Sequence, residues 1–139
     1  MLGCKNEKFK TIRILKYKMA DFGVWTKNVD IQAKAGTKAN STSKATAATD
    51  VYVLEIESLV KVLTKHNWSD AYANLNADVK HILKGITSSL CAIIVIQWDM
   101  SGFTSRIEAE DMINILRDSA LRDLSIVRDK KNQKFMIEA

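Results

Sequence analysis

The stretch WDMSGFTSRIEAEDMINIL (residues 98–116) joins two apolar helical patterns through a polar corner. Gly102 is typical of a helix C-terminus, where glycine takes the left-handed conformation without a Cβ clash. Ser105 and Glu108 then form the S-x-x-E pattern of a capping box, which starts the next helix, although Thr104 can serve as the cap instead. The stretch therefore predicts a junction between two helices, in which Gly102, Ser105 and Glu108 have structural roles and no catalytic chemistry is required.

Apolar residues recur at helical spacing on both sides of this corner. They predict three main helices, at about residues 51–66, 77–100 and 105–128. The apolar stripes are Tyr52, Ile56, Leu59, Val60 and Leu63 in the first helix; Val79, Ile82, Leu83, Ile86, Leu90, Ile93, Ile94 and Trp98 in the second; and Met112, Ile113, Leu116, Ala120, Leu121, Leu124 and Val127 in the third. The predicted fold class is all-α, a small bundle of three main helices with an extended N-terminal arm and a C-terminal tail.

Polar residues mark where the helices are expected to begin. Thr49 or Asp50 can cap the first helix, and Asn76 can cap the second. Ser69 can cap a short helical turn over residues 70–74. The second helix is apolar nearly all round in the run LCAIIVI, and a helix of that kind is either central in its own chain or covered by neighbouring subunits.

The chain divides into three parts by composition. Residues 1–49 are predicted to be a basic leader followed by an extended or flexible arm. In this arm NVDIQAKAG alternates apolar and polar residues, and GTKANSTSKATAAT has too few large apolar groups to fold by itself. Residues 50–128 are the predicted helical domain. Residues 129–139 are predicted to be a polar tail with a short apolar cluster.

Large apolar side chains in the arm and the tail lie outside the helical core pattern. Such groups usually dock onto a surface, which is either the body of their own chain or another subunit, and the sequence does not separate these two cases. They are the candidate subunit or portal interface residues: Trp25, Val29, Ile31, Phe135, Met136 and Ile137.

The net charge of +5 is concentrated at one end of the 139-residue chain. Residues 1–18 hold six basic and one acidic side chain, whereas the rest of the chain holds 15 of each. A neutral body has little long-range attraction for phosphate, so the basicity predicts nucleic-acid binding only for this leader. Met19 is a second possible start of translation, and the leader is then an extension from an upstream start codon.

Side chains able to carry chemistry all have structural explanations. His66 lies at the end of a predicted helix, where a cation suits the helix dipole, and His81 lies beside an apolar stripe. Glu110 and Asp111 fall in the first turn of a helix, which the same dipole favours. Motifs for zinc, for phosphate-binding loops and for a nucleophile elbow are absent from the sequence. We therefore expect no enzymatic activity, no metal and no cofactor.

The two cysteines do not suggest a disulfide framework. Cys91 lies inside an apolar helical run, where a free cysteine behaves as a small hydrophobe, and this is typical of a protein made in a reducing cytoplasm. No apolar stretch is uninterrupted for about 18 residues, so the sequence predicts no membrane span.

The order of elements in residues 50–128 resembles that of the head–tail connector, or adaptor, proteins of tailed bacteriophages. A first helix ends in TKHNW, a second contains the V-x-x-I-L pattern and an Ala/Ile-containing run, and a third amphipathic helix follows a short turn. The segment MADFGVWTKNVDIQAKAG also looks phage-like, whereas the first 18 residues are not required by that family.

The resemblance implies a role in the neck of a virion made in the bacterial host cytoplasm. Members of this family form a ring beneath the portal, usually with twelve copies, which continues the DNA exit channel and offers a platform for the tail. The implied partners are further copies of the chain, the portal protein and a tail or neck protein. DNA would pass through the channel without sequence-specific binding, and no membrane is involved.

Two other interpretations remain from the sequence. One is another phage neck component, such as a head-completion or tail-terminator protein. The other is a small helical DNA-binding regulator that uses the basic leader. A helix-turn-helix role for the predicted third helix is disfavoured, because Glu108, Glu110 and Asp111 would meet the phosphates at its start.

Overall fold

The computed structural model describes residues 23–138, and these residues are almost entirely helical. The helices are α2 (Asn28–Ala35), α3 (Thr46–Thr64), α4 (Trp68–Ala71), the 3-10 helix η1 (Tyr72–Asn74), α5 (Ala77–Trp98), α6 (Arg106–Arg128) and α7 (Lys130–Glu138). Within this described part no residue is in a strand. The all-α fold class is therefore confirmed, but a bundle of three helices is an incomplete description.

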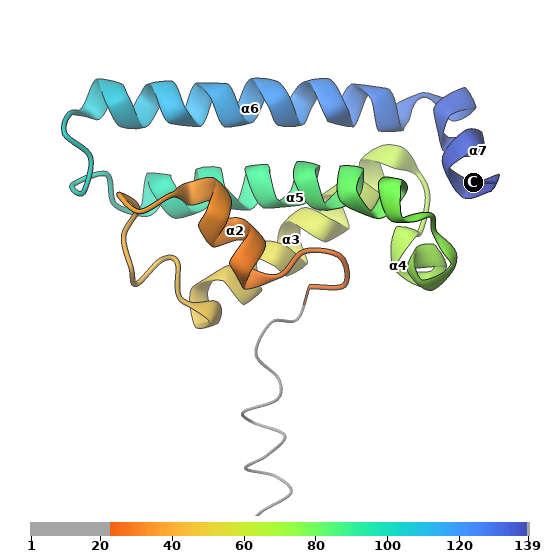
Figure 1. The fold of residues 1–139 in the computed structure, drawn as a ribbon, viewed down its shortest axis with the longest axis horizontal. Coiled ribbons are helices and arrows are strands. Elements are labelled where there is room, and N and C mark those ends of the chain that lie inside the picture. The colour runs from red at the N-terminus through yellow and green to blue at the C-terminus, as the bar shows by residue number, and fades with distance from the viewer. Residues whose placement is uncertain (1–22, 139) are drawn as a thin grey trace, which may run out of the picture.

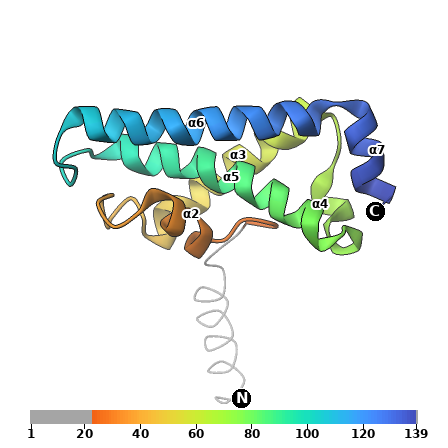
Figure 2. The same ribbon diagram turned by 45° about the horizontal axis from the view of Figure 1, so that its top comes forward.

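Helix α5 lies at the centre of the fold, where it packs against α2, α3 and α6. Figures 1 and 2 show α6 running alongside α5 for most of its length, with α2 on the other side of α5. Helix α3 packs against α5 and also contacts α6. The apolar residues of α5 are buried between these neighbours, among them Leu83, Ile86, Val95 and Ile96. The nearly uniform apolar character of α5 is thus explained by burial within its own chain.

Local capping sets the starts of the two longest helices. The Asn76 side chain accepts a hydrogen bond from the Asp78 backbone N–H at 2.9 Å at the start of α5. At the start of α6, Ser105 Oγ accepts from the Glu108 N–H at 3.2 Å. Each bond satisfies one backbone donor that has no partner inside the helix.

The prediction that residues 28–35 are extended is wrong, because this stretch forms α2. The sequence NVDIQAKA fits two periods: its apolar residues alternate, but Asn28, Ile31 and Ala35 also share one helical face, and this is the face that is buried. Asp30 accepts a hydrogen bond from the Lys27 backbone N–H at 3.0 Å, which helps to start the helix. Packing of the buried face against α5 decides between the two periods.

Helix α3 begins at Thr46, earlier than predicted, and neither Thr49 nor Asp50 is its cap. The N-cap residue is Ala45, which has no side-chain capping bond. Thr49 is buried inside the helix, where its Oγ1 accepts a hydrogen bond from Asn28 Nδ2 at 2.6 Å. The residue therefore joins α3 to α2.

Residues 36–45 connect α2 to α3 and are held to the corner between α5 and α6. Asn40 Nδ2 donates to Asp99 Oδ2 at 2.8 Å, and Ser43 Oγ donates to the Val95 carbonyl at 2.8 Å. Only ten residues of the expected flexible linker, 36–45, lie outside a helix, and these residues make tertiary contacts.

The predicted C-terminal tail is also a helix, α7. Its Gln133 is buried and donates through Nε2 to the carbonyl of Thr64, at 2.8 Å, while Lys130 Nζ reaches the same carbonyl at 3.2 Å. The carbonyls in the last turn of a helix lack partners within the helix, so α7 caps the C-terminus of α3. Figure 1 shows α7 turning back beside α4 at the end of the fold.

The short turn predicted over residues 70–74 is present as α4 and η1. Its cap is Asn67, whose side chain accepts from the Asp70 N–H, and not Ser69 as predicted. Trp68 is buried beneath this turn and donates through Nε1 to Thr64 Oγ1 at 2.9 Å.

Candidate interaction surfaces

The six candidate interface residues separate into a buried and an exposed group. Trp25, Ile31 and Met136 are part of the core, with 1%, 0% and 5% of their surfaces exposed. They dock onto the body of their own chain, which resolves the alternative left open for Trp25 by the sequence. The exposed members are Val29, Phe135 and Ile137, and the Phe135 side chain is 73% exposed.

Residues 23–27, which we call the strap, cross over α3 and are held by one carboxylate. Glu57 Oε2 accepts from the Val24 backbone N–H at 3.1 Å, and Glu57 Oε1 accepts from Trp25 and Thr26 at 3.2 and 3.3 Å. Trp25 also donates through its indole Nε1 to Thr87 Oγ1 at 2.7 Å. The strap is therefore fixed to both α3 and α5.

The burial of Glu57 perturbs its acidity. Loss of solvent raises the pKa of Glu57 above its ordinary value, and the three backbone N–H groups and the charge of Lys61 oppose this rise. Sequence reasoning missed Glu57, although a signal was present: it shares the buried face of α3 with Val53 and Val60. A carboxylate on an apolar stripe predicts a polar partner from elsewhere in the chain.

The predicted corner residues have structural roles, but the predicted reasons change for Gly102 and for Glu108. Gly102 does not adopt the left-handed conformation. Instead the backbone of Lys38 passes so close that a Cβ at Gly102 would lie 2.2 Å from the Lys38 carbonyl oxygen. Ser105 caps α6 as predicted, but the return bond of the predicted capping box is shifted by one residue, because the Glu108 side chain accepts from the Thr104 N–H at 3.2 Å and not from that of Ser105.

Glu108 additionally pairs with the ammonium of Lys38. This hydrogen bond is the largest cause that lowers the pKa of Glu108 below its ordinary value. The carboxylate thus holds the backbone that precedes α6 through Thr104 and anchors residues 36–45 through Lys38.

The side chains that could carry chemistry do not come together at one site. Among residues 23–138, no group of three or more His, Cys, Asp or Glu side chains is arranged to hold a metal ion. Cys91 is buried, and this burial, together with the nearby charges of Glu57 and Glu55, raises the pKa of its thiol to about 12. The thiol therefore stays protonated and is a poor nucleophile at neutral pH.

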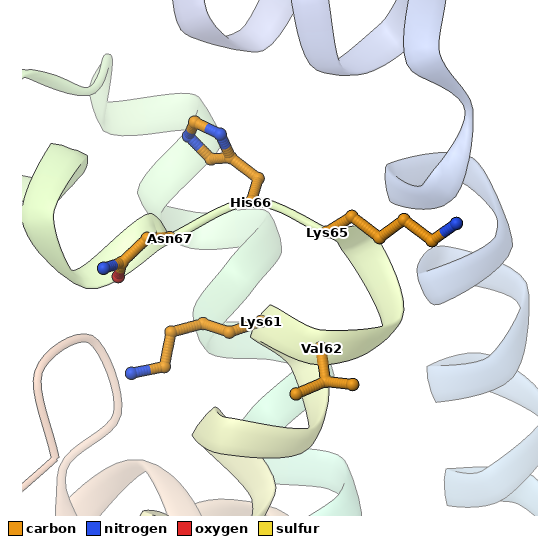
Figure 3. Close-up of a pocket in the computed structure, with 5 residues that line it drawn as sticks. All are labelled: Lys61, Val62, Lys65, His66 and Asn67. Carbon is orange, nitrogen blue, oxygen red and sulfur yellow. The ribbon is translucent and has the colours of Figure 1, made fainter.

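An open hollow lies at the end of α3, lined by Lys61, Val62, Lys65, His66 and Asn67. Figure 3 shows these side chains pointing in different directions, with His66 directed away from both lysines. The His66 ring packs edge-on against Trp68, with 4.4 Å between ring centroids. The hollow therefore has no set of polar groups aimed at a common ligand.

The outward face of α3 carries four exposed apolar side chains, and the exposed polar residues Glu55 and Ser58 lie between them. Val51, Leu54 and Val62 lie within one face by helical spacing, with Leu59 at its edge, and their side chains are between 43% and 73% exposed. Exposed apolar residues of α6 such as Ile115 also lie among charged side chains. Exposed apolar side chains gathered on one side of a helix are typical of contact surfaces.

Helix α5 is the one helix in residues 23–138 that is long and apolar enough to cross a membrane by length and composition. More than half of its most apolar window, 56%, is buried inside the protein, and a central core helix passes the same test. The apolar character of α5 is accounted for by its packing against α2, α3 and α6.

Comparison with known proteins found no family model, no curated protein and no solved structure that matches this chain.

Proposed function

We propose that this protein is a structural subunit without enzymatic activity, which acts by assembling with further copies of itself. The observation that carries the proposal is the apolar outward face of α3, formed by Val51, Leu54, Leu59 and Val62. A rigid helix that presents such a face gains free energy when a partner removes the face from water.

The specific assembly that we propose is a head–tail connector ring in the neck of a tailed-phage virion. This rests on the resemblance of residues 50–128 to that family. A contact between different faces of neighbouring copies closes into a ring when its rotation permits. Residues 19–139 carry equal numbers of basic and acidic side chains, which suits a channel wall that lets DNA pass without holding it. Another neck component of the same virion is the nearest alternative.

The first experiment measures the mass of the full-length protein by light scattering, with negative-stain microscopy for rings, alone and with a portal protein. The double variant Leu54→Glu, Val62→Glu places charge on the α3 face and is expected to abolish assembly. Ile115→Glu is the matched control, since Ile115 is 69% exposed on α6 and lies outside that face. Assembly that survives the double variant, or that the control abolishes equally, rejects the α3 face as the contact.

A DNA-binding regulator is the alternative from another class, favoured by the basic residues 1–18. It predicts a monomer that does not bind the portal protein and that binds DNA with a steep salt dependence. Removal of residues 1–18 would then abolish binding. The proposed connector instead keeps its assembly after this removal, and its DNA binding depends only weakly on salt.

A further inference from the structure

The strap and the helices that bind it contribute different hydrogen-bonding groups. The strap supplies three consecutive backbone N–H groups and one indole N–H, and the body supplies only acceptors, the Glu57 carboxylate and the Thr87 hydroxyl. The set of bonds depends on backbone N–H groups and a tryptophan. Any segment with the same sequence satisfies the site equally well.

The site requires an occupant. Glu57 is only 4% exposed, and an ionised carboxylate at such a position is costly unless donors surround it. Trp25, which is 1% exposed, fills the space beside Thr87. Without a strap the body would keep both a poorly solvated charge and an uncovered apolar recess, so an empty site is the least favourable state.

The chain can release the strap at a single position. Lys27 is extended, with φ of −111° and ψ of 161°, and α2 begins at the next residue. Rotation at Lys27 therefore moves the strap and breaks one bond at the start of α2, the bond from the Lys27 backbone N–H to Asp30. Five extended residues reach roughly 17 Å.

We infer that the Glu57–Thr87 site accepts the strap of a second copy of this chain, so that copies join by strap exchange. Each contact within the chain is then replaced by an identical contact between chains, which is why exchange of an identical element is a low-cost route to association. If each copy gives its strap to the next, the contact is head-to-tail and can extend into a ring. This inference rests on the proposed self-assembly and names the segment that carries it.

The test places a photo-crosslinking amino acid at position 24 of the full chain. Val24 is suitable because its side chain is 41% exposed while its backbone N–H lies at the Glu57 carboxylate. The probe chain is refolded with an equal amount of heavy-isotope-labelled chain that carries no probe. After irradiation, mass spectrometry identifies whether strap peptides are joined to α3 peptides of the same chain or of the labelled one.

Strap exchange predicts that up to about half of the strap–α3 crosslinks join the two isotopic forms, since each strap then meets labelled and unlabelled sites equally often. A probe at Val29, which is 70% exposed and follows the release point, is the matched control and should not give these links. Crosslinks confined to single chains overturn the inference.

Light scattering on the same samples separates this outcome from failure of the proposed function. Oligomers whose strap crosslinks stay within single chains overturn strap exchange and leave assembly in place, whereas monomers with the same crosslinks overturn both. If the probe variant does not fold, Val24→Cys in a Cys4→Ser chain, labelled after folding with a benzophenone maleimide, gives the same readout because Cys91 is fully buried.

Discussion

At the scale of single residues, two glycines with opposite surroundings test the account of the corner. A methyl group at Gly102 would lie 2.2 Å from the Lys38 carbonyl oxygen, whereas one at Gly85, inside α5, meets nothing within 4 Å. We predict that Gly102→Ala lowers the free energy of unfolding by about 1–3 kcal/mol because the backbone must shift. Gly85→Ala should raise it by about 0.5–1 kcal/mol because alanine favours a helix. Urea unfolding measures both changes. Equal effects of the two substitutions would contradict the close approach of residues 36–45.

Glu57 gives a pH-dependent prediction at the same scale. Its pKa is raised in the folded protein, so the folded chain holds this proton more tightly than the unfolded chain does. The contribution of Glu57 to stability is therefore full below the ordinary carboxylate pKa and is lost as the pH rises through the raised value. Glu57→Gln does not titrate there, so wild type should lose stability relative to this variant as the pH rises through that window. A stability difference that stays constant with pH would contradict the raised pKa.

At the scale of secondary-structure elements, α7 docks onto the end of α3 through contacts that the local sequence does not predict. The Thr64 carbonyl accepts from both Gln133 and Lys130, and Thr64 Oγ1 accepts from Trp68. Thr64, at the end of α3, is thereby hydrogen-bonded to both α4 and α7. This explains why the polar sequence KKNQKFMIE (residues 130–138) is helical here, since its helix is stabilised by docking rather than by a wide apolar face.

Loss of this cap should release α7. We predict that Gln133→Ala costs about 1–2 kcal/mol of stability, because the buried Thr64 carbonyl loses a donor. The linker at Asp129 should then be cut faster by a protease. Phe135→Ala is the matched control, because Phe135 lies on the same helix and is largely exposed. If the control opens α7 as readily as Gln133→Ala does, the cap is not what holds this helix.

At the scale of the whole molecule, the strap and α2 belong to the core and not to a separate arm. Ile31 is fully buried, whereas Val29, two residues earlier, is 70% exposed. We predict that Ile31→Asp costs on the order of 4 kcal/mol or more, since it buries an unpaired charge, and lowers the thermal midpoint of the helical circular dichroism signal. Val29→Asp should leave that midpoint nearly unchanged. An unaltered midpoint for Ile31→Asp would restore the independent arm that the sequence predicts.

The amino-acid sequence by itself determined α5, α6 and the corner between them, because long apolar periods and the local caps Asn76 and Ser105 agree there. Only the tertiary structure decided residues 28–35 and 130–138. These segments are too short for one period to dominate, and the surface onto which they dock selects the helix. The same holds for Glu57: its place on α3 follows from the sequence, but its three backbone donors come from residues more than 30 positions away. Local rules cannot place partners that only the folded chain brings together.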